Sequence, residues 1–164
     1  MNDALYSLSE RIGVLLVARG HKLATAESCT GGWIAKCLTD VAGSSEWFER
    51  GFVTYSNRAK QEMLDVKDAT LIADGAVSEA TVGEMVVGAL RHSTAQCALA
   101  VSGIAGPGGG TADKPVGLVW FAWKRVDGLC RSRRQIFEGD REAVRFLAVR
   151  MALQGVLDEY AGSG

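Results

Sequence analysis

The chain has 164 residues, of which 48% are hydrophobic, and this suits one folded domain with a substantial core. Its formal net charge of −1 gives no electrostatic footprint for nucleic acid or an anionic membrane, so we expect neither as a partner. No apolar run approaches the roughly 20 residues that span a bilayer. The first thirty residues also lack the basic start and apolar run of a signal peptide.

Cysteine and histidine usage argues against a metal site. The four cysteines (Cys29, Cys37, Cys97 and Cys130) show no short spacing of a zinc or redox motif, and the two histidines are isolated. We therefore predict no metal and no cofactor. Free thiols without a leader sequence predict a reducing, cytoplasmic compartment.

The first half of the chain alternates helix and strand patterns. Apolar residues at helical spacing predict a helix over 4–19, which Gly20 ends. Next come a short strand over 22–26, a helix over 31–41, a strand over 47–55, and a helix from Asn57, as N-cap, to 63.

The second half ends in a hairpin and a long helix. Ser78 caps a helix over 78–92, a buried strand follows over 96–103, and strands over 116–126 and 129–137 are joined by a tight Asp127-Gly128 turn. A last helix covers 140–160, and residues 160–164 are expected to be a frayed tail. This order predicts a three-layer α/β/α sandwich with a mixed sheet, in one domain over 1–164.

A first polar segment, residues 26–32, lies between a strand end and a helix start. In open α/β sheets, ligands bind beyond the carboxyl ends of strands. If Thr30 caps the helix, the N–H groups of Gly31 and Gly32 point outward, and the Ser28 hydroxyl is well placed for nucleophilic attack. The alternative is a capped helix with small packing residues. Cys29 is a rival nucleophile, although no histidine is paired with it.

A second polar segment, residues 54–60, holds Lys60 in the first turn of a helix. The helix dipole disfavours a cation there, and burial would favour the neutral amine further. A neutral lysine can act as the base for a serine, as in known Ser-Lys enzymes. The alternative is an exposed ammonium group.

Two further segments suit an anionic ligand. The glycine-rich loop 103–110 follows a buried strand, and its backbone N–H groups could hold phosphate or carboxylate. It lacks the features of a P-loop, and a plain flexible loop is the alternative. Arg141 follows Asp140, a candidate helix cap, and could hold a phosphate with two hydrogen bonds or form a surface ion pair.

Taken together, segments across the chain closely resemble the nicotinamide-nucleotide amidase family, also called the CinA C-terminal domain family. The resemblance rests on residues 26–32, 51–57 with Lys60, 75–78, 102–107 and 114–117, in that order. No single motif is decisive, but five in register are specific, and they cover essentially the whole chain. Ser102 stands where many relatives have threonine, which keeps a hydroxyl.

The resemblance implies metal-free hydrolysis of nicotinamide mononucleotide to nicotinate mononucleotide and ammonia on an α/β/α sandwich. It implies a catalytic serine and lysine assisted by a tyrosine, and these roles fall on Ser28, Lys60 and Tyr55. The residues expected to bind the substrate are Glu27, Thr30, Gly31, Gly32, Asn57, Ser102, Gly103, Ile104, Ala105, Gly106 and Arg141.

Three rival functions stay open at this point. One is a module that binds a pyridine nucleotide without hydrolysing it, another a role linked to DNA competence or repair, and a third an amidase for another small amide. The sequence also leaves open whether copies of the chain form a homo-oligomer.

Overall fold

A five-stranded sheet organises residues 2–162, the part of the chain that the computed structural model describes. The strands are β1 (Leu23–Glu27), β2 (Phe48–Val53), β3 (Cys97–Gly103), β4 (Leu118–Arg125) and β5 (Arg131–Ile136). They lie in the order β2-β1-β3-β4-β5. β1 pairs in parallel with β2 and β3, whereas β3 with β4 and β4 with β5 are antiparallel. The predicted mixed sheet is thus confirmed.

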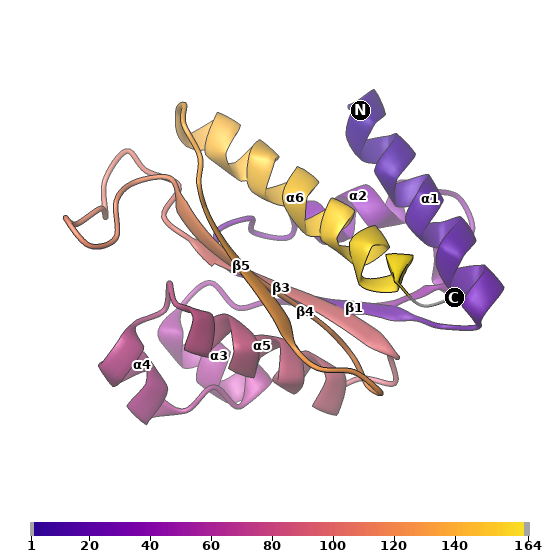
Figure 1. Ribbon diagram of the computed structural model, residues 1–164, viewed down its shortest axis with the longest axis horizontal. Helices are drawn as coiled ribbons and strands as arrows, with labels where there is room; N and C mark the ends of the chain where they lie inside the picture. The colour runs from indigo at the N-terminus through magenta and orange to yellow at the C-terminus, as the bar shows by residue number, and fades with distance from the viewer. Residues whose placement is uncertain (1, 163–164) are drawn as a thin grey trace.

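Helices cover both faces of the sheet, which gives the predicted three layers (Figure 1). One face carries α1 (Asp3–Arg19), α2 (Trp33–Thr39) and α6 (Arg141–Ala161), and a short 3-10 helix, η1 (Ser44–Glu46), precedes β2. The other face carries α3 (Asn57–Leu64), α4 (Asp68–Asp74) and α5 (Glu79–Arg91). α5 packs on β1, β3 and β4, while α1 packs on α6.

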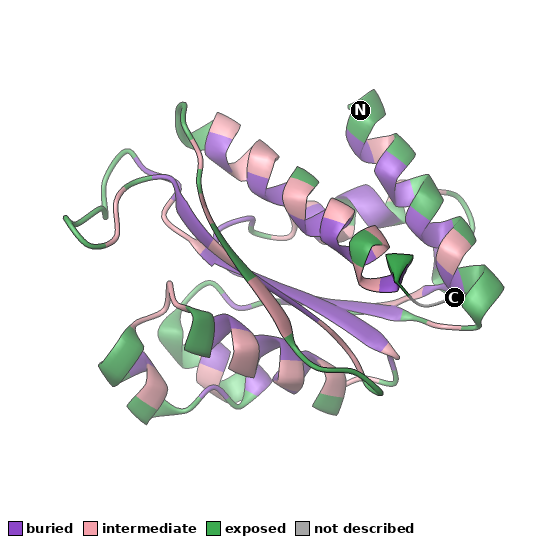
Figure 2. Ribbon diagram, in the orientation of Figure 1, coloured by how far each residue is buried: buried purple, intermediate pink, exposed green. Residues whose placement is uncertain are grey.

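The two cores differ in side-chain size because strand residues alternate between the faces. In β3, Leu99 and Val101 point to the α1–α6 side, whereas Ala98 and Ala100 point to the α5 side. Small side chains let α5 lie close to the central strands, which are buried along their length (Figure 2).

The structure corrects three local predictions. α4 was not expected, because its seven residues are too few for a clear helical pattern. The hairpin turn is longer than the predicted pair, since residues 126–130 connect β4 to β5 and Gly128 N–H donates to Arg125 O. The tail prediction is wrong for residue 160, since the buried Tyr160 lies in α6 and its hydroxyl is 2.8 Å from His21 Nδ1. Residues 163–164 lie outside the described part.

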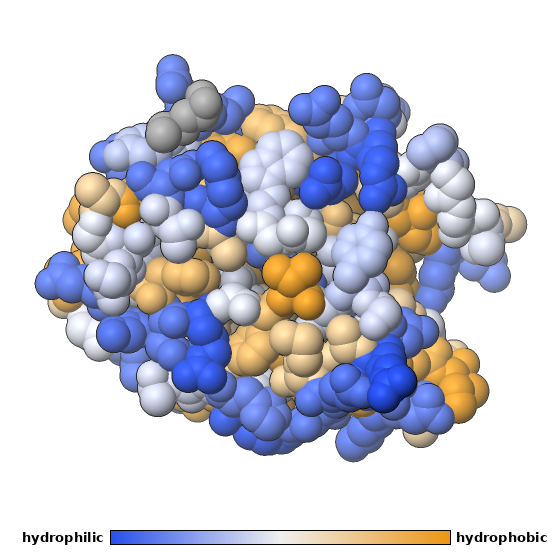
Figure 3. All heavy atoms as spheres, turned by 180° about the vertical axis from the view of Figure 1, so that it is seen from behind, coloured by the Kyte–Doolittle hydropathy of each residue, from blue (hydrophilic) through white to orange (hydrophobic). Residues whose placement is uncertain are grey.

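The surface shows no single continuous apolar face from behind, where hydrophobic residues are interspersed with hydrophilic ones (Figure 3). Within residues 2–162, no helix combines the length and the apolar character needed to cross a membrane.

Candidate active site

The carboxyl ends of β1, β2 and β3 meet at one edge of the sheet because the three strands are parallel. Ser28 follows β1, and its backbone N–H donates to Val101 O of β3 over 3.0 Å. Thr54 follows β2, and its N–H donates to Glu27 O over 2.8 Å. The residues after neighbouring strands are thus fixed side by side.

Ser28 and Lys60 meet at this edge. Lys60 Nζ lies 2.9 Å from Ser28 Oγ and 2.9 Å from Thr54 O. Lys60 is the fourth residue of α3, whose N-cap is Ser56 and not the predicted Asn57, because the Ser56 hydroxyl accepts from Ala59 N–H. The structure therefore joins the serine and lysine that stood in separate sequence segments.

Lys60 is buried, with 1% of its surface exposed, and no carboxylate forms an ion pair with it in the described part of the chain. Burial lowers the pKa of Lys60 from 10.5 to about 8, because removal from water disfavours the charged form. The neutral amine that a base requires is therefore present at neutral pH as a minor form.

Cys29 lies next to Ser28 in the same loop. Burial raises the pKa of the Cys29 thiol to about 12, so the thiolate that a cysteine nucleophile needs is scarce. The geometry therefore favours the Ser28 hydroxyl over its neighbour.

The 28–32 loop is organised differently from the sequence expectation. Thr30 does not cap α2, because its hydroxyl donates to Glu27 Oε1 over 2.7 Å. The buried Glu27 carboxylate caps the helix instead, accepting from Ile34 N–H at 2.9 Å and Ala35 N–H at 3.0 Å. Gly31 N–H donates to Ser28 O, so it is not a free donor for a ligand. Positive φ values of 58° and 98° explain the two glycines at positions 31 and 32.

Tyr55 and Arg141 meet on the outer side of the site. Arg141 Nη2 donates to Tyr55 Oη over 3.0 Å, and Arg141 Nη1 donates to Gly106 O over 2.8 Å. Tyr55 is 60% exposed, and its hydroxyl makes no hydrogen bond to Lys60. Asp140 caps α6 through Ala143 N–H, as predicted.

A cavity of about 290 Å³ opens beside Ser28 and Lys60. The predicted site residues that line it are Ser28, Tyr55, Asn57, Lys60, Ser102, Gly103, Ile104, Ala105, Gly106 and Arg141. The predicted binding residues Glu27, Thr30, Gly31 and Gly32 do not line it. Glu27 and Thr30 instead hold the loop together by their mutual hydrogen bond.

Gly108 and Gly109 of the predicted glycine-rich loop and the rival nucleophile Cys29 also line the cavity, whereas two further lining residues, Ala76 and Val77, were not predicted for the site. The motif 75–78 was a signal for Ala76 and Val77, but these apolar residues carry no chemistry that marks a site. No group of three histidine, cysteine, aspartate or glutamate residues suited to a metal ion occurs in residues 2–162.

Comparison with known proteins gives consistent matches over nearly the whole chain. The family model for the CinA C-terminal domain matches residues 5–160. The chain is 55% identical to nicotinamide-nucleotide amidohydrolase PncC of Escherichia coli K12 over 161 residues, 98% of each chain. It is 50% identical over 155 residues to the protein of that name from Pseudomonas putida, covering 94% of this chain and 96% of the relative.

Solved structures agree. The competence/damage inducible protein CihA from Agrobacterium tumefaciens superposes with a TM-score of 0.94 at 45% identity, and the match covers 96% of both chains.

Proposed function

This chain belongs to the CinA C-terminal domain family, and we propose that it is an amidohydrolase that converts nicotinamide mononucleotide to nicotinate mononucleotide and ammonia. The observation that carries the proposal is the 2.9 Å contact between Ser28 Oγ and the buried amine of Lys60. Relatives named as nicotinamide-nucleotide amidohydrolases support the choice of substrate.

In the proposed mechanism, the neutral Lys60 amine accepts the Ser28 proton as Oγ attacks the carboxamide carbon. With a pKa of about 8, about one Lys60 side chain in ten is neutral at pH 7. Thr54 O accepts a hydrogen bond from Nζ and orients its lone pair. The C–N bond then breaks, Lys60 passes the proton to the leaving nitrogen, and ammonia departs. Water hydrolyses the remaining ester, which releases nicotinate mononucleotide and restores Ser28.

The negative charge on the carbonyl oxygen needs N–H donors. The Cys29 N–H donates to no other residue within residues 2–162, and Cys29 lines the cavity, whereas Thr30 is fully buried and does not line it. We assign the Cys29 N–H to the oxyanion, in place of the Gly31 amide, which donates to Ser28 O.

At the other end of the cavity, Arg141 and the glycine-rich loop are suited to the phosphate and ribose. Arg141 is held by Gly106 O and the Tyr55 hydroxyl, so its guanidinium is positioned beside the cavity before a ligand binds. In this arrangement Tyr55 orients Arg141, and a proton relay through Tyr55 would require a further contact between its hydroxyl and Lys60.

Ammonia release from nicotinamide mononucleotide tests the proposal, with Ser28→Ala as the control. We expect turnover by the natural chain and none by the variant. Binding without ammonia release would favour a pyridine-nucleotide sensor. Release from other amides but not from this nucleotide would favour another amidase, and a gel shift with DNA at physiological salt would favour a DNA-linked role.

A further inference from the structure

Arg145 holds the 28–32 loop from α6, one helical turn beyond Arg141. Its Nε donates to Cys29 O over 3.1 Å, and its Nη2 donates to Thr30 O over 3.2 Å. Its guanidinium carbon also lies 5.4 Å from the centre of the Trp33 ring. No carboxylate pairs with Arg145 in the described residues, so its charge is directed at two backbone carbonyls.

Each of these two carbonyls shares its peptide group with an N–H of the 28–32 loop. A charge on Arg145 therefore polarises N–H groups close to the site where the carbonyl oxygen of the substrate becomes negative. The Cys29 carbonyl shares its peptide group with Thr30 N–H, which is free within residues 2–162. The Thr30 carbonyl shares its peptide group with Gly31 N–H, which donates to Ser28 O over 3.0 Å. The Ser28 carbonyl in turn shares its peptide group with the Cys29 N–H, which donates to no other residue in the described part of the chain. Hydrogen bonds in such a chain polarise one another.

We propose that Arg145 is a positioning residue for the reaction at Ser28. It fixes the 28–32 loop and, through the hydrogen bond from Gly31 N–H to Ser28 O, strengthens the Cys29 N–H as a donor to the negatively charged oxygen. Arg145 does not line the cavity, so it acts through the loop and not by touching substrate. This inference rests on the proposed amidohydrolase function.

The loop has a second, independent attachment, which makes the inference testable. Glu27 is fully buried and binds Thr30 Oγ1 and two N–H groups at the start of α2. Loss of the Arg145 contacts therefore leaves the loop tied to the helix. We expect Arg145 variants to fold, with the loop less well fixed.

The test compares Arg145→Met with Arg145→Lys. A matched control is Arg150→Met, because Arg150 is an exposed arginine on the same helix that makes no hydrogen bond or ion pair within residues 2–162. We expect Arg145→Met to lower kcat for nicotinamide mononucleotide by about 10- to 100-fold with little change in KM. Arg145→Lys should recover part of this loss, because a lysine keeps the charge but cannot bridge both carbonyls. The control should behave like the natural chain.

Two further readouts separate this role from a merely structural one. The rate should keep its apparent pKa near 8 in both variants, because the contacts of Lys60 are unchanged. Labelling of Ser28 by a fluorophosphonate, in which Oγ bonds to phosphorus and fluoride leaves, counts reactive sites without any amide substrate. We expect full labelling in Arg145→Met at a rate lowered about tenfold.

Three results would overturn the inference: an unchanged kcat in Arg145→Met, a loss confined to KM, or a reduced labelled fraction with an unchanged labelling rate. If the natural chain labels at Ser28 but releases no ammonia from the nucleotide, the proposed function fails, and the labelling rates alone decide the role of Arg145. A natural chain that does not label at Ser28 contradicts both.

Discussion

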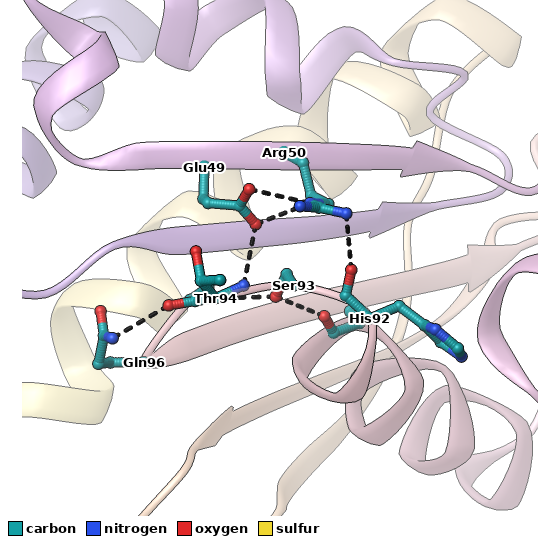
Figure 4. Close-up of polar contacts among 8 residues, drawn as sticks. Glu49, Arg50, His92, Ser93, Thr94 and Gln96 are labelled. Carbon is teal, nitrogen blue, oxygen red and sulfur yellow. Dashed lines mark hydrogen bonds and ion pairs between the residues drawn. The ribbon is translucent and has the colours of Figure 1, made fainter.

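Two polar clusters lie at opposite ends of the parallel strands, and they treat charge in opposite ways. At the amino ends, Glu49 and Arg50 form an ion pair at 2.7 Å, Arg50 donates to His92 O, and Glu49 accepts from Thr94 N–H (Figure 4). At the carboxyl ends, Lys60 is buried beside Ser28 with no counter-charge within residues 2–162.

The two clusters shift the pKa values of their charged groups for different reasons. The hydrogen bond from Arg50 lowers the pKa of Glu49, so that the charged form is favoured. Burial lowers the pKa of Lys60, so that the charged form is disfavoured. The ion-paired cluster of Glu49 and Arg50 connects β2 to the loop after α5. The buried amine of Lys60 has no ion-pair partner in the described residues, which lowers the stability of the fold but makes the amine more reactive as a base. Burial and pairing, more than the density of polar residues, separate the two.

The largest expected effect is at Ser28. Ser28→Ala should lower turnover by at least about 10⁴-fold, because it removes the group that forms the covalent intermediate. The melting temperature should change little, since within residues 2–162 the hydroxyl makes a hydrogen bond only with Lys60. Ammonia release and thermal unfolding measure the two effects. A variant with a near-natural rate would move the nucleophile to Cys29 or Thr30.

Replacing Lys60 should change both the activity and the stability of the protein, because it removes the buried amine that distinguishes the two clusters. We expect Lys60→Met to lower the rate by about 10³-fold and to raise the free energy of unfolding at pH 7 by up to about 3 kcal/mol, since it removes a disfavoured buried charge. Lys60→Arg should be equally inactive, because guanidinium keeps its proton. Kinetics and urea unfolding are the measurements. An active Lys60→Arg would show that residue 60 is not the base.

The lowered pKa of Lys60 should be visible in the pH dependence of both the free energy of unfolding and the rate. Between pH 8 and 10.5 the unfolded chain holds the Lys60 proton while the folded chain has lost it, so stability rises with pH. Relative to Lys60→Met, the free energy of unfolding should therefore rise across this window and stay level below pH 8. The rate should rise through an apparent pKa near 8. A rate independent of pH from 6 to 10 would exclude a titrating base.

Arg141 combines features of the two clusters, because its charge is exposed like that of Arg50 yet lies at the cavity like that of Lys60. Arg141→Ala should raise KM for the mononucleotide by about 10- to 100-fold, the size of a charge-assisted hydrogen bond, and affect the dephosphorylated riboside much less. Steady-state kinetics with both substrates measure this. Equal losses would mean that Arg141 acts through Tyr55 or Gly106 and does not contact the phosphate.

The smallest effect is expected in the paired cluster. Arg50→Gln should cost less than about 1 kcal/mol of stability and leave turnover unchanged, because exposed ion pairs contribute little. Urea unfolding at low and high salt measures the cost, which should shrink as salt screens the pair. A loss of turnover would link this end of the sheet to the site.

The sequence by itself determined the layers of this protein and the segments that carry its chemistry. Apolar patterns together with capping and turn residues marked five of the six α-helices and all five strands within residues 2–162, because most elements must bury one face or both. Ser28 and Lys60 stood out because each is a polar residue beside an apolar element.

Tertiary structure alone decided what those residues can do. Burial of Lys60, protonation of Cys29 and the pairing of Tyr55 with Arg141, 86 residues away, depend on packing between distant segments. Glu27 shows the same limit: beside Ser28 in the sequence it suggested a ligand contact, but the folded chain turns its carboxylate toward the start of α2. Local patterns fix which face of an element is apolar, whereas solvent exposure and long-range hydrogen bonds are set only when the elements pack together.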